Sequence, residues 1–97
     1  MGITIIVKVL ISVGRHIVYI CYLKIMGKAL LLISFGEKVR KERFGMRLTQ
    51  EGLAKVVGVH RTYIGMVERG EQNITLINLH KIAKGLNVKT SELLEGL

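Results

Sequence analysis

Apolar residues recur every three to four positions from residue 35 onward, the period with which a helix buries one face. The pattern predicts five helices and no strands. A domain this small must bury most of these side chains to be stable. The predicted stripes are Phe35, Val39 and Phe44 in the first helix, Leu53, Val56 and Val57 in the second, Ile64 and Val67 in the third, and Leu76, Leu79, Ile82 and Ala83 in the fourth. The fifth is a short helix that contains Leu93 and Leu94.

Polar residues and glycines stand at the expected helix ends. Thr49 and Thr75 each precede a stripe and offer a hydroxyl that can accept a hydrogen bond from the first turn of a helix. Gly58 and Gly70 each follow a stripe, where glycine tolerates the left-handed backbone that ends many helices. The last helix is expected to open at residue 90 or 91, both of which carry a hydroxyl.

Residues 1–33 differ from the rest and are expected to form an apolar N-terminal extension. They are rich in Ile and Val, lack a clean helical period, and precede the first acidic residue, Glu37. Lys8 and Arg15 interrupt the apolar run, and an arginine near the centre of a bilayer costs roughly 2.5 to 3.5 kcal/mol. A transmembrane helix is therefore disfavoured, and so is a signal peptide, because no small-residue cleavage site follows.

The role of this extension stays open between two interpretations. Met26 is an internal methionine shortly before the recognisable domain, so we favour a natural start there, with residues 1–25 as translated upstream sequence. The alternative is an extra strand or helix that covers apolar surface of the domain. In either case the five-helix domain is expected to span residues 34–97.

The charge of the chain indicates an anionic partner, either nucleic acid or a membrane surface. The net charge is +8, and residues 26–97 alone hold twelve Lys and Arg against seven Glu, a net charge of +5. Cys21 is the single cysteine, which excludes a disulfide within one chain and is typical of a reducing compartment such as the cytoplasm.

The stretch from residue 49 to residue 70 has the layout of a helix-turn-helix. Two short helices meet at a turn that contains Gly58, and the small Ala54 lets them cross closely. Val59 can fill the space under the turn, while Ile64 and Val67 anchor the second helix. In such a motif the second helix is the recognition helix, which lies in the major groove of DNA. Its outward-facing residues are expected to be Arg61, Thr62, Tyr63, Gly65 and Arg69.

Six groups of residues have the spacing of a known family: Leu48 to Glu51, Leu53-Ala54, Gly58-Val59, Glu68 to Gly70, Asn73 to Leu76, and Ile82 to Val88. By these motifs the chain resembles the Cro and lambda-repressor-like family, also called the XRE family. The run His60 to Ile64 is similar to that of restriction–modification controller proteins. The resemblance covers residues 35–97 and implies an all-α fold, a compact five-helix domain that binds double-stranded DNA.

Two positions depart from the family pattern. Gly52 stands where the family often has a glutamate that completes a capping box with Thr49, and glycine costs about 1 kcal/mol of helix propensity relative to alanine. Arg47 stands where the family often has a glycine, two residues before that threonine. The loop between the first two helices is therefore expected to differ from that of the family.

Position and resemblance together imply the main roles. Arg61 is expected to read a base, because a guanidinium can pair with O6 and N7 of guanine; the alternative is a phosphate contact. Thr62 can offer a methyl to thymine or a hydroxyl to a phosphate. Gln50 is expected to contact the DNA backbone with the helix amides, or else to be a solvated polar residue. Glu68 is expected to face inward and pair with Arg43, since a half-buried carboxylate needs a partner.

The remaining residues of the interface have two interpretations each. Arg69 is expected to contact a phosphate at the end of the recognition helix. His60 is expected to cap that helix or to contact a phosphate. Tyr63 can bond a phosphate through its hydroxyl or pack against the domain. Gly65 would allow close approach of the duplex, or is a tolerated exposed glycine.

The resemblance also implies a homodimer, because one helix-turn-helix reads only a few base pairs. Two-fold symmetry places two recognition helices about 34 Å apart on a palindromic operator. Leu93, Leu94 and Leu97 are the expected dimer interface, extended by Ile77 and Leu86; the alternative is that these residues cover the domain's own core.

No pattern in the sequence suggests an enzyme, a metal or a cofactor. The three histidines and Cys21 lack zinc-ligand spacing, and no nucleophile motif or phosphate-binding glycine loop occurs. We therefore expect a sequence-specific transcriptional regulator of the repressor or controller type, without a small-molecule ligand. The alternatives are the antitoxin of a toxin–antitoxin pair and a membrane-associated regulator driven by residues 1–25.

Overall fold

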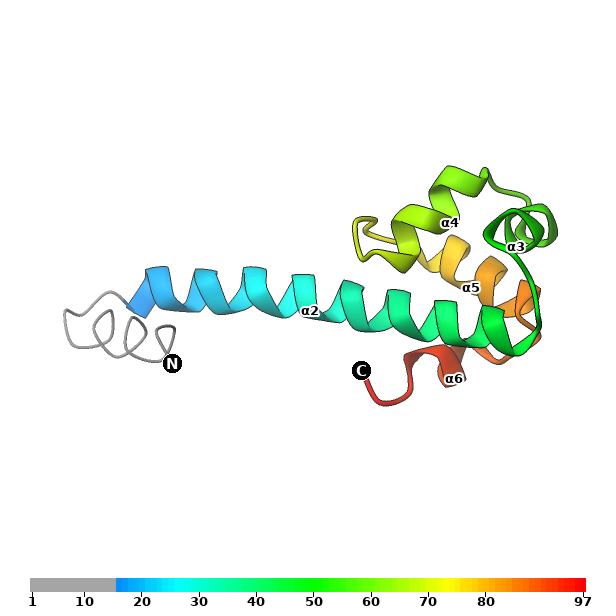
Figure 1. The fold of residues 1–97 in the computed structure, drawn as a ribbon. Coiled ribbons are helices and arrows are strands. Elements are labelled where there is room, and N and C mark those ends of the chain that lie inside the picture. The colour runs from blue at the N-terminus through cyan, green and yellow to red at the C-terminus, as the bar shows by residue number, and fades with distance from the viewer. Residues whose placement is uncertain (1–15) are drawn as a thin grey trace.

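The computed structural model describes residues 16–97, with side chains from residue 26 onward. This part of the chain contains five helices and no strand (Figure 1). The helices are α2 (His16–Gly45), α3 (Gln50–Val57), α4 (Arg61–Glu68), α5 (Leu76–Gly85) and α6 (Thr90–Leu94). The all-α, five-helix fold expected from the sequence is confirmed.

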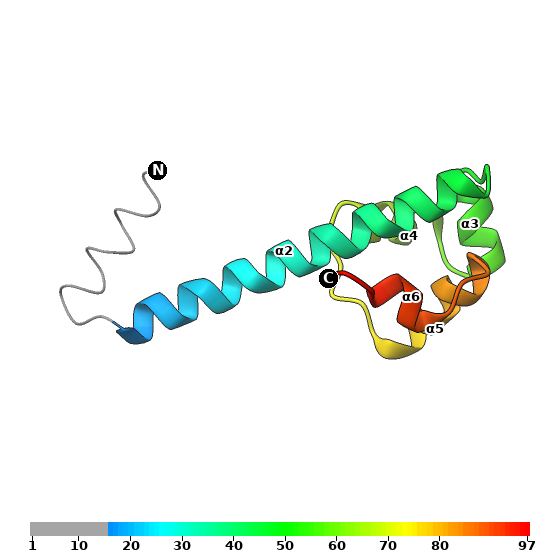
Figure 2. The same cartoon turned by 90° about the horizontal axis from the view of Figure 1, so that it is seen from below.

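The C-terminal half of α2 and the four shorter helices form a compact head, from which the N-terminal half of α2 projects (Figure 1, Figure 2). α2 packs on α4 and α6, α3 packs on α4 and α5, and α5 packs on α6. As a result α3 and α4 lie together on one side of the head, while α6 lies on the other side, next to the C-terminus.

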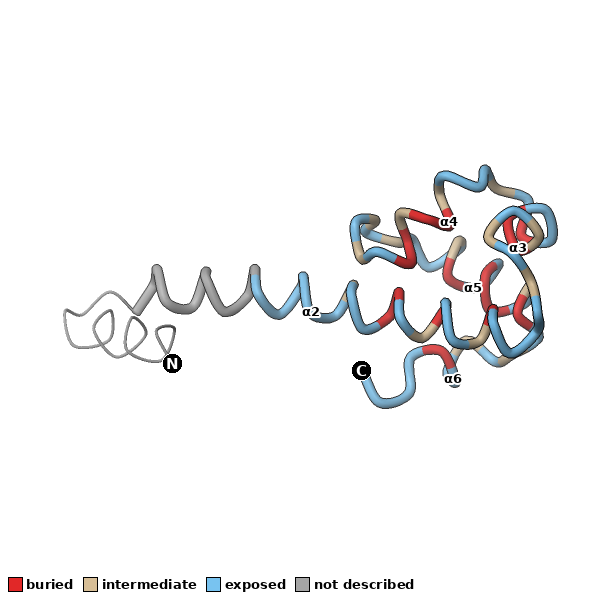
Figure 3. Tube along the Cα trace, viewed as in Figure 1, coloured by how far each residue is buried: buried red, intermediate tan, exposed pale blue. Residues whose placement is uncertain are grey.

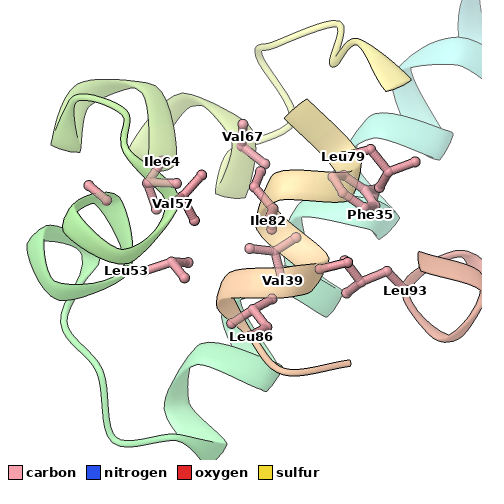
Figure 4. Close-up of a cluster of buried hydrophobic side chains, with 12 residues drawn as sticks. Phe35, Val39, Leu53, Val57, Ile64, Val67, Leu79, Ile82, Leu86 and Leu93 are labelled. Carbon is pink, nitrogen blue, oxygen red and sulfur yellow. The ribbon is translucent and has the colours of Figure 1, made fainter. Parts of the chain in front are cut away.

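One hydrophobic core holds the head together, and each helix contributes to it. Val39 of α2, Leu53 of α3, Ile64 of α4, Ile82 of α5 and Leu93 of α6 have no exposed surface, and they converge in the middle of the head (Figure 4). Full burial of a side chain of this size contributes about 1.5 to 3 kcal/mol, so this cluster is the main source of stability.

The predicted helix ends at α3 and α5 are confirmed. The hydroxyl of Thr49 accepts from the N–H of Gly52 at 2.9 Å, and that of Thr75 accepts from the N–H of Asn78 at 3.2 Å. Gly58 ends α3 with a φ of 83°, the left-handed region that a side chain would disfavour. α6 begins at the first of its two hydroxyl residues but has no side-chain cap.

Three residues expected in the core are exposed instead: Phe44 by 57%, Val56 by 60% and Leu76 by 76%. The buried face of α2 runs through Arg43, and the next position along a helix is turned by about 100°. The ring of Phe44 therefore lies outside, where the guanidinium carbons of Arg40 and Arg43 stand 5.4 and 4.6 Å from its centroid. The sequence pattern therefore overestimated the width of these three buried stripes.

Gly36 sets how closely α2 approaches the end of α4. A Cβ on Gly36 would lie 2.4 Å from the carbonyl oxygen of Val67 and 2.5 Å from that of Glu68. No side chain fits in that space, so the backbones of the two helices touch directly. This contact fixes the last turn of α4 on α2, and the sequence analysis did not anticipate it.

The first helix is much longer than the sequence pattern indicated. α2 begins at His16, so the expected boundary between residues 33 and 34 falls inside it, and residues 1–15 lie outside the described residues. Leu30 and Leu31 are exposed by 59% and 51%, so this part of α2 does not cover the core (Figure 3). Within the described part of the chain, no helix is long and apolar enough to cross a bilayer.

Candidate nucleic-acid interface

α3 and α4 form the helix-turn-helix that the sequence predicted. The N–H groups of Gly58 and Val59 both donate to the carbonyl of Ala54, at 2.8 and 3.0 Å, which closes the turn tightly. Ala54 is buried, and Val59 is half-buried against the core. Ile64 and Val67 anchor α4 with almost no exposed surface. The packing expected of these residues is confirmed.

Six of the seven residues expected to touch DNA line one open hollow on the surface of α3 and α4. They are Gln50, His60, Arg61, Thr62, Gly65 and Arg69. The structure thus brings together side chains from the start of α3 and from one side of α4, which are separated along the chain by the turn.

The N-terminal end of α4 is suited to acceptors on DNA. Nδ1 of His60 accepts from the N–H of Thr62 at 3.1 Å and caps the helix, as one of its two interpretations expected. A neutral imidazole that accepts at Nδ1 carries its proton on Nε2, which remains free to donate. Arg61 and Thr62 are exposed in the first turn, at the positive end of the helix dipole.

A buried ion pair is connected to this hollow through Gln50. Nε of Arg43 donates to Oε2 of Glu68 at 2.7 Å and Nη2 donates to Oε1 at 2.9 Å, which confirms the predicted pairing. Nη1 of Arg43 also donates to the carbonyl of Leu48 at 2.9 Å, and Nε2 of Gln50 donates to Oε1 of Glu68 at 3.3 Å. Because every charged group here has partners, the pair ties α2, α3 and α4 together.

Gly65 is buried, which corrects the expectation that it faces outward and rules out the alternative of an exposed glycine. Two side chains cover it: Nη1 of Arg69 lies 3.1 Å, and Oε1 of Gln50 lies 3.6 Å, from the point where a Cβ on Gly65 would stand. Nε of Arg69 donates to Oε2 of Glu71 at 2.6 Å, in an ion pair with both side chains more than half exposed.

Tyr63 is the one predicted contact that does not line the hollow. Its ring packs against the core, half-buried, and its hydroxyl accepts from Nδ2 of Asn78 at 3.0 Å. This bond links α4 to α5. The sequence analysis missed both Asn78 and Glu71, because each lies in a different element or loop from its partner and no helical spacing connects them.

The C-terminal leucines divide between core and surface. Leu93 has no exposed surface, and Leu86 is 2% exposed, so neither is available for the dimer interface expected of them. Leu94 and Leu97 are 46% and 42% exposed and line an apolar hollow together with α2 residues such as Leu31. These two leucines remain candidates for contact with a second copy.

Comparison with known proteins supports this reading of the site. The helix-turn-helix family HTH_3 matches residues 39–93. Control protein C.SmaI of Serratia marcescens is 52% identical over 58 residues, which are 60% of this chain and 69% of the relative. Control protein C.BamHI of Bacillus amyloliquefaciens is 45% identical over 62 residues, 63% of this chain and 76% of the relative.

A solved structure agrees with these sequence relatives. The crystal structure of the restriction-modification controller protein C.AhdI from Aeromonas hydrophila matches with a TM-score of 0.63 at 42% identity, over 64% of this chain and 94% of that chain. The relatives named here are controllers, which points to a regulatory role and not to catalysis. They favour neither an antitoxin nor a membrane-associated regulator. The protein is a DNA-binding transcriptional regulator, and the chain belongs to the helix-turn-helix family HTH_3.

Proposed function

We propose that the protein is a controller that inserts α4 into the major groove of a palindromic operator and acts in the cytoplasm. The observation that carries this proposal is the convergence of Gln50, Arg61 and Thr62 on one hollow at the N-terminal end of α4. In helix-turn-helix complexes, this end of the recognition helix lies at the base edges. The net charge of +5 on residues 26–97 supports attraction to the phosphates on either side.

Each of these side chains has a proposed partner on the duplex. Arg61 pairs with O6 and N7 of a guanine, and Thr62 contacts a thymine methyl or a phosphate. Gln50 and His60 contact the backbone, and the hydrogen bond from Gln50 to Glu68 holds its amide in place before DNA arrives. Tyr63 contributes through its hydroxyl proton while its oxygen is held by Asn78.

Two copies of the chain bind together in this proposal. One recognition helix contacts too few bases for operator-level specificity, so a two-fold symmetric dimer places two of them about 34 Å apart. The exposed Leu94 and Leu97 belong to the end of α6 and to the C-terminus. α6 and the C-terminus lie on the side of the head away from α3 and α4, where an interface would leave the recognition helices free.

The names of the relatives indicate which genes are controlled. C.AhdI is described as a controller of a restriction–modification system, and C.SmaI and C.BamHI are control proteins. We extend that role to this chain, so that its operator lies upstream of a restriction or modification gene or of its own gene.

The test is to select bound duplexes from a random-sequence library with the full chain, and then to footprint the enriched sequence in the chain's own upstream DNA. We expect an inverted repeat with half-sites about one helical turn apart, and an affinity that falls with salt. Enrichment of an unrepeated sequence would exclude the symmetric dimer. Equal recovery of all sequences would leave only non-specific binding and overturn the proposal.

A further inference from the structure

The guanidinium of Arg69 occupies the place over α4 that a side chain at position 65 would fill. Arg61, Gly65 and Arg69 follow one another at intervals of four residues, so they lie along one face of the recognition helix. Nη1 of Arg69 stands 3.1 Å from the Cβ position of Gly65. The side chain of Arg69 therefore turns back along α4, and does not extend away from the end of the helix.

Glu71 keeps the guanidinium in that position. It lies two residues after Arg69, in the loop that follows α4, and its Oε2 accepts from Nε of Arg69 at 2.6 Å. An ion pair this exposed adds little to stability, so its effect is on geometry. The hydrogen bond uses Nε alone, which leaves the two Nη groups for another acceptor.

Gln50 bounds the same space from α3. Its Oε1 lies 3.6 Å from the Cβ position of Gly65, while its Nε2 donates to Glu68. The guanidinium thus stands over a glycine, with a carboxylate at its Nε and an amide oxygen nearby. It lines the same hollow as Arg61 and Thr62, the proposed readers of bases.

We infer that Arg69 is a second base-reading residue of the recognition helix, and that Gly65 and Glu71 are the positioning residues that direct it to a base edge. The inference rests on the proposed function and replaces the phosphate contact expected of Arg69 from the sequence. A phosphate clamp would lie at the flank of the helix, whereas this guanidinium lies on the face of Arg61. Its free Nη edge matches the paired acceptors of guanine.

The decisive experiment uses the selected operator and every single-base variant of it, with the wild-type chain and with Arg69→Lys and Arg69→Ala. Lysine keeps the charge but not the planar fork, so it would satisfy a phosphate and not a guanine. We expect both variants to lose at least about fivefold discrimination at one base position per half-site, distinct from the position that Arg61 controls. Full retention of base preference by Arg69→Lys would show a phosphate contact and overturn the inference.

Gly65→Ala tests the positioning step. The added methyl would stand 3.1 Å from Nη1 of Arg69, so the guanidinium must shift by a few tenths of an ångström. Alanine favours the helix, so the variant is expected to fold at least as well as the wild type. It should weaken discrimination at the position controlled by Arg69, with no further effect in the Arg69→Ala background. An equal effect in both backgrounds would show that Gly65 acts without Arg69. Gly27→Ala on the projecting part of α2 is the matched control, because nothing lies near that glycine.

Glu71→Ala separates positioning from simple charge. Loss of a negative charge near DNA raises affinity for every sequence, and loss of the carboxylate that accepts from Nε of Arg69 also lowers discrimination at the position read by Arg69. Glu92→Ala, with the same charge change on α6, should leave discrimination unchanged. A Glu71→Ala profile of base preference identical to that of the wild type would overturn the role of Glu71. A wild-type chain that selects no sequence would refute the proposed function instead, and is recognised before any variant is measured.

Discussion

Arg43 of α2 and Glu68 of α4 form a bidentate ion pair, with hydrogen bonds of 2.7 and 2.9 Å, in which both residues are less than 10% exposed. Removal of one partner leaves the other charge buried without compensation. We therefore expect Glu68→Ala to lower the free energy of unfolding by about 3 kcal/mol or more, measured by urea denaturation.

The exposed pair of the same chemistry is the matched control. Arg69 and Glu71 are more than half exposed, so Glu71→Ala should cost no more than about 1 kcal/mol. Replacement of both buried partners, Arg43→Met with Glu68→Leu, should recover much of the lost stability, since no charge is then left without a partner. A double variant as unstable as Glu68→Ala would show that packing, and not the unpaired charge, sets the cost.

Arg61→Ala should weaken binding to the selected operator by about 1 to 3 kcal/mol and relax the preference at one base position. The physical reason is that Arg61 is exposed in the first turn of α4 and lines the hollow that we propose to face the bases. Titration of the operator and its single-base variants measures both effects. Lys84→Ala, in the last turn of α5, is the comparison. If Arg61→Ala weakens every sequence equally, Arg61 contacts only phosphate.

Local rules account for much of what the sequence could predict. Thr49 and Thr75 cap their helices because each hydroxyl can accept from an N–H of the first turn that has no partner within the helix. Gly58 ends α3 because the backbone there has a positive φ. The pairing of Arg43 with Glu68 needed more than a local rule. The two residues are 25 positions apart, and only the resemblance to a known family connected them.

Contacts that depend on tertiary geometry could not be predicted. Nothing in the sequence around Gly36 indicates that the backbone of α4 packs directly against this residue. The direction of the Arg69 side chain could not be predicted, because it depends on a hydrogen bond to Glu71 in the loop after α4. The helical part of the N-terminal extension gave no periodic signal, because apolar residues there occur at every helical phase and not on one face.

Arg47 has a φ of 57°, in the left-handed region that costs a residue with a side chain roughly 1–2 kcal/mol. It stands where the family often has glycine. Arg47→Gly should therefore stabilise the protein by about 0.5 to 1 kcal/mol, after the larger entropy of glycine in the unfolded chain is subtracted. Thermal unfolding should show this as a rise in Tm. Arg47→Ala removes the same charge but keeps the Cβ, so a gain as large in that variant would contradict the backbone explanation.

A chain of residues 26–97 should fold and select the same operator as the full chain. All described members of the core lie between Phe35 and Leu93, and the neighbouring part of α2 is largely exposed. Circular dichroism with urea denaturation, followed by operator titration, measures both properties. An unfolded spectrum, or loss of operator selection in a folded chain, would show that residues 1–25 are required.

Leu94→Asp with Leu97→Asp should convert the protein into a folded monomer. Both leucines are nearly half exposed at the C-terminal end, and a charge at an apolar interface must be desolvated without a partner. Sedimentation should show the monomer, and operator affinity should fall by about 100-fold or more, because two half-sites are no longer bound by one linked unit. Leu76→Asp is the control, because it makes the same substitution at another exposed leucine, at the start of α5. Dissociation by Leu76→Asp alone would place the interface at α5, whereas a double variant that stays dimeric would exclude the C-terminal leucines.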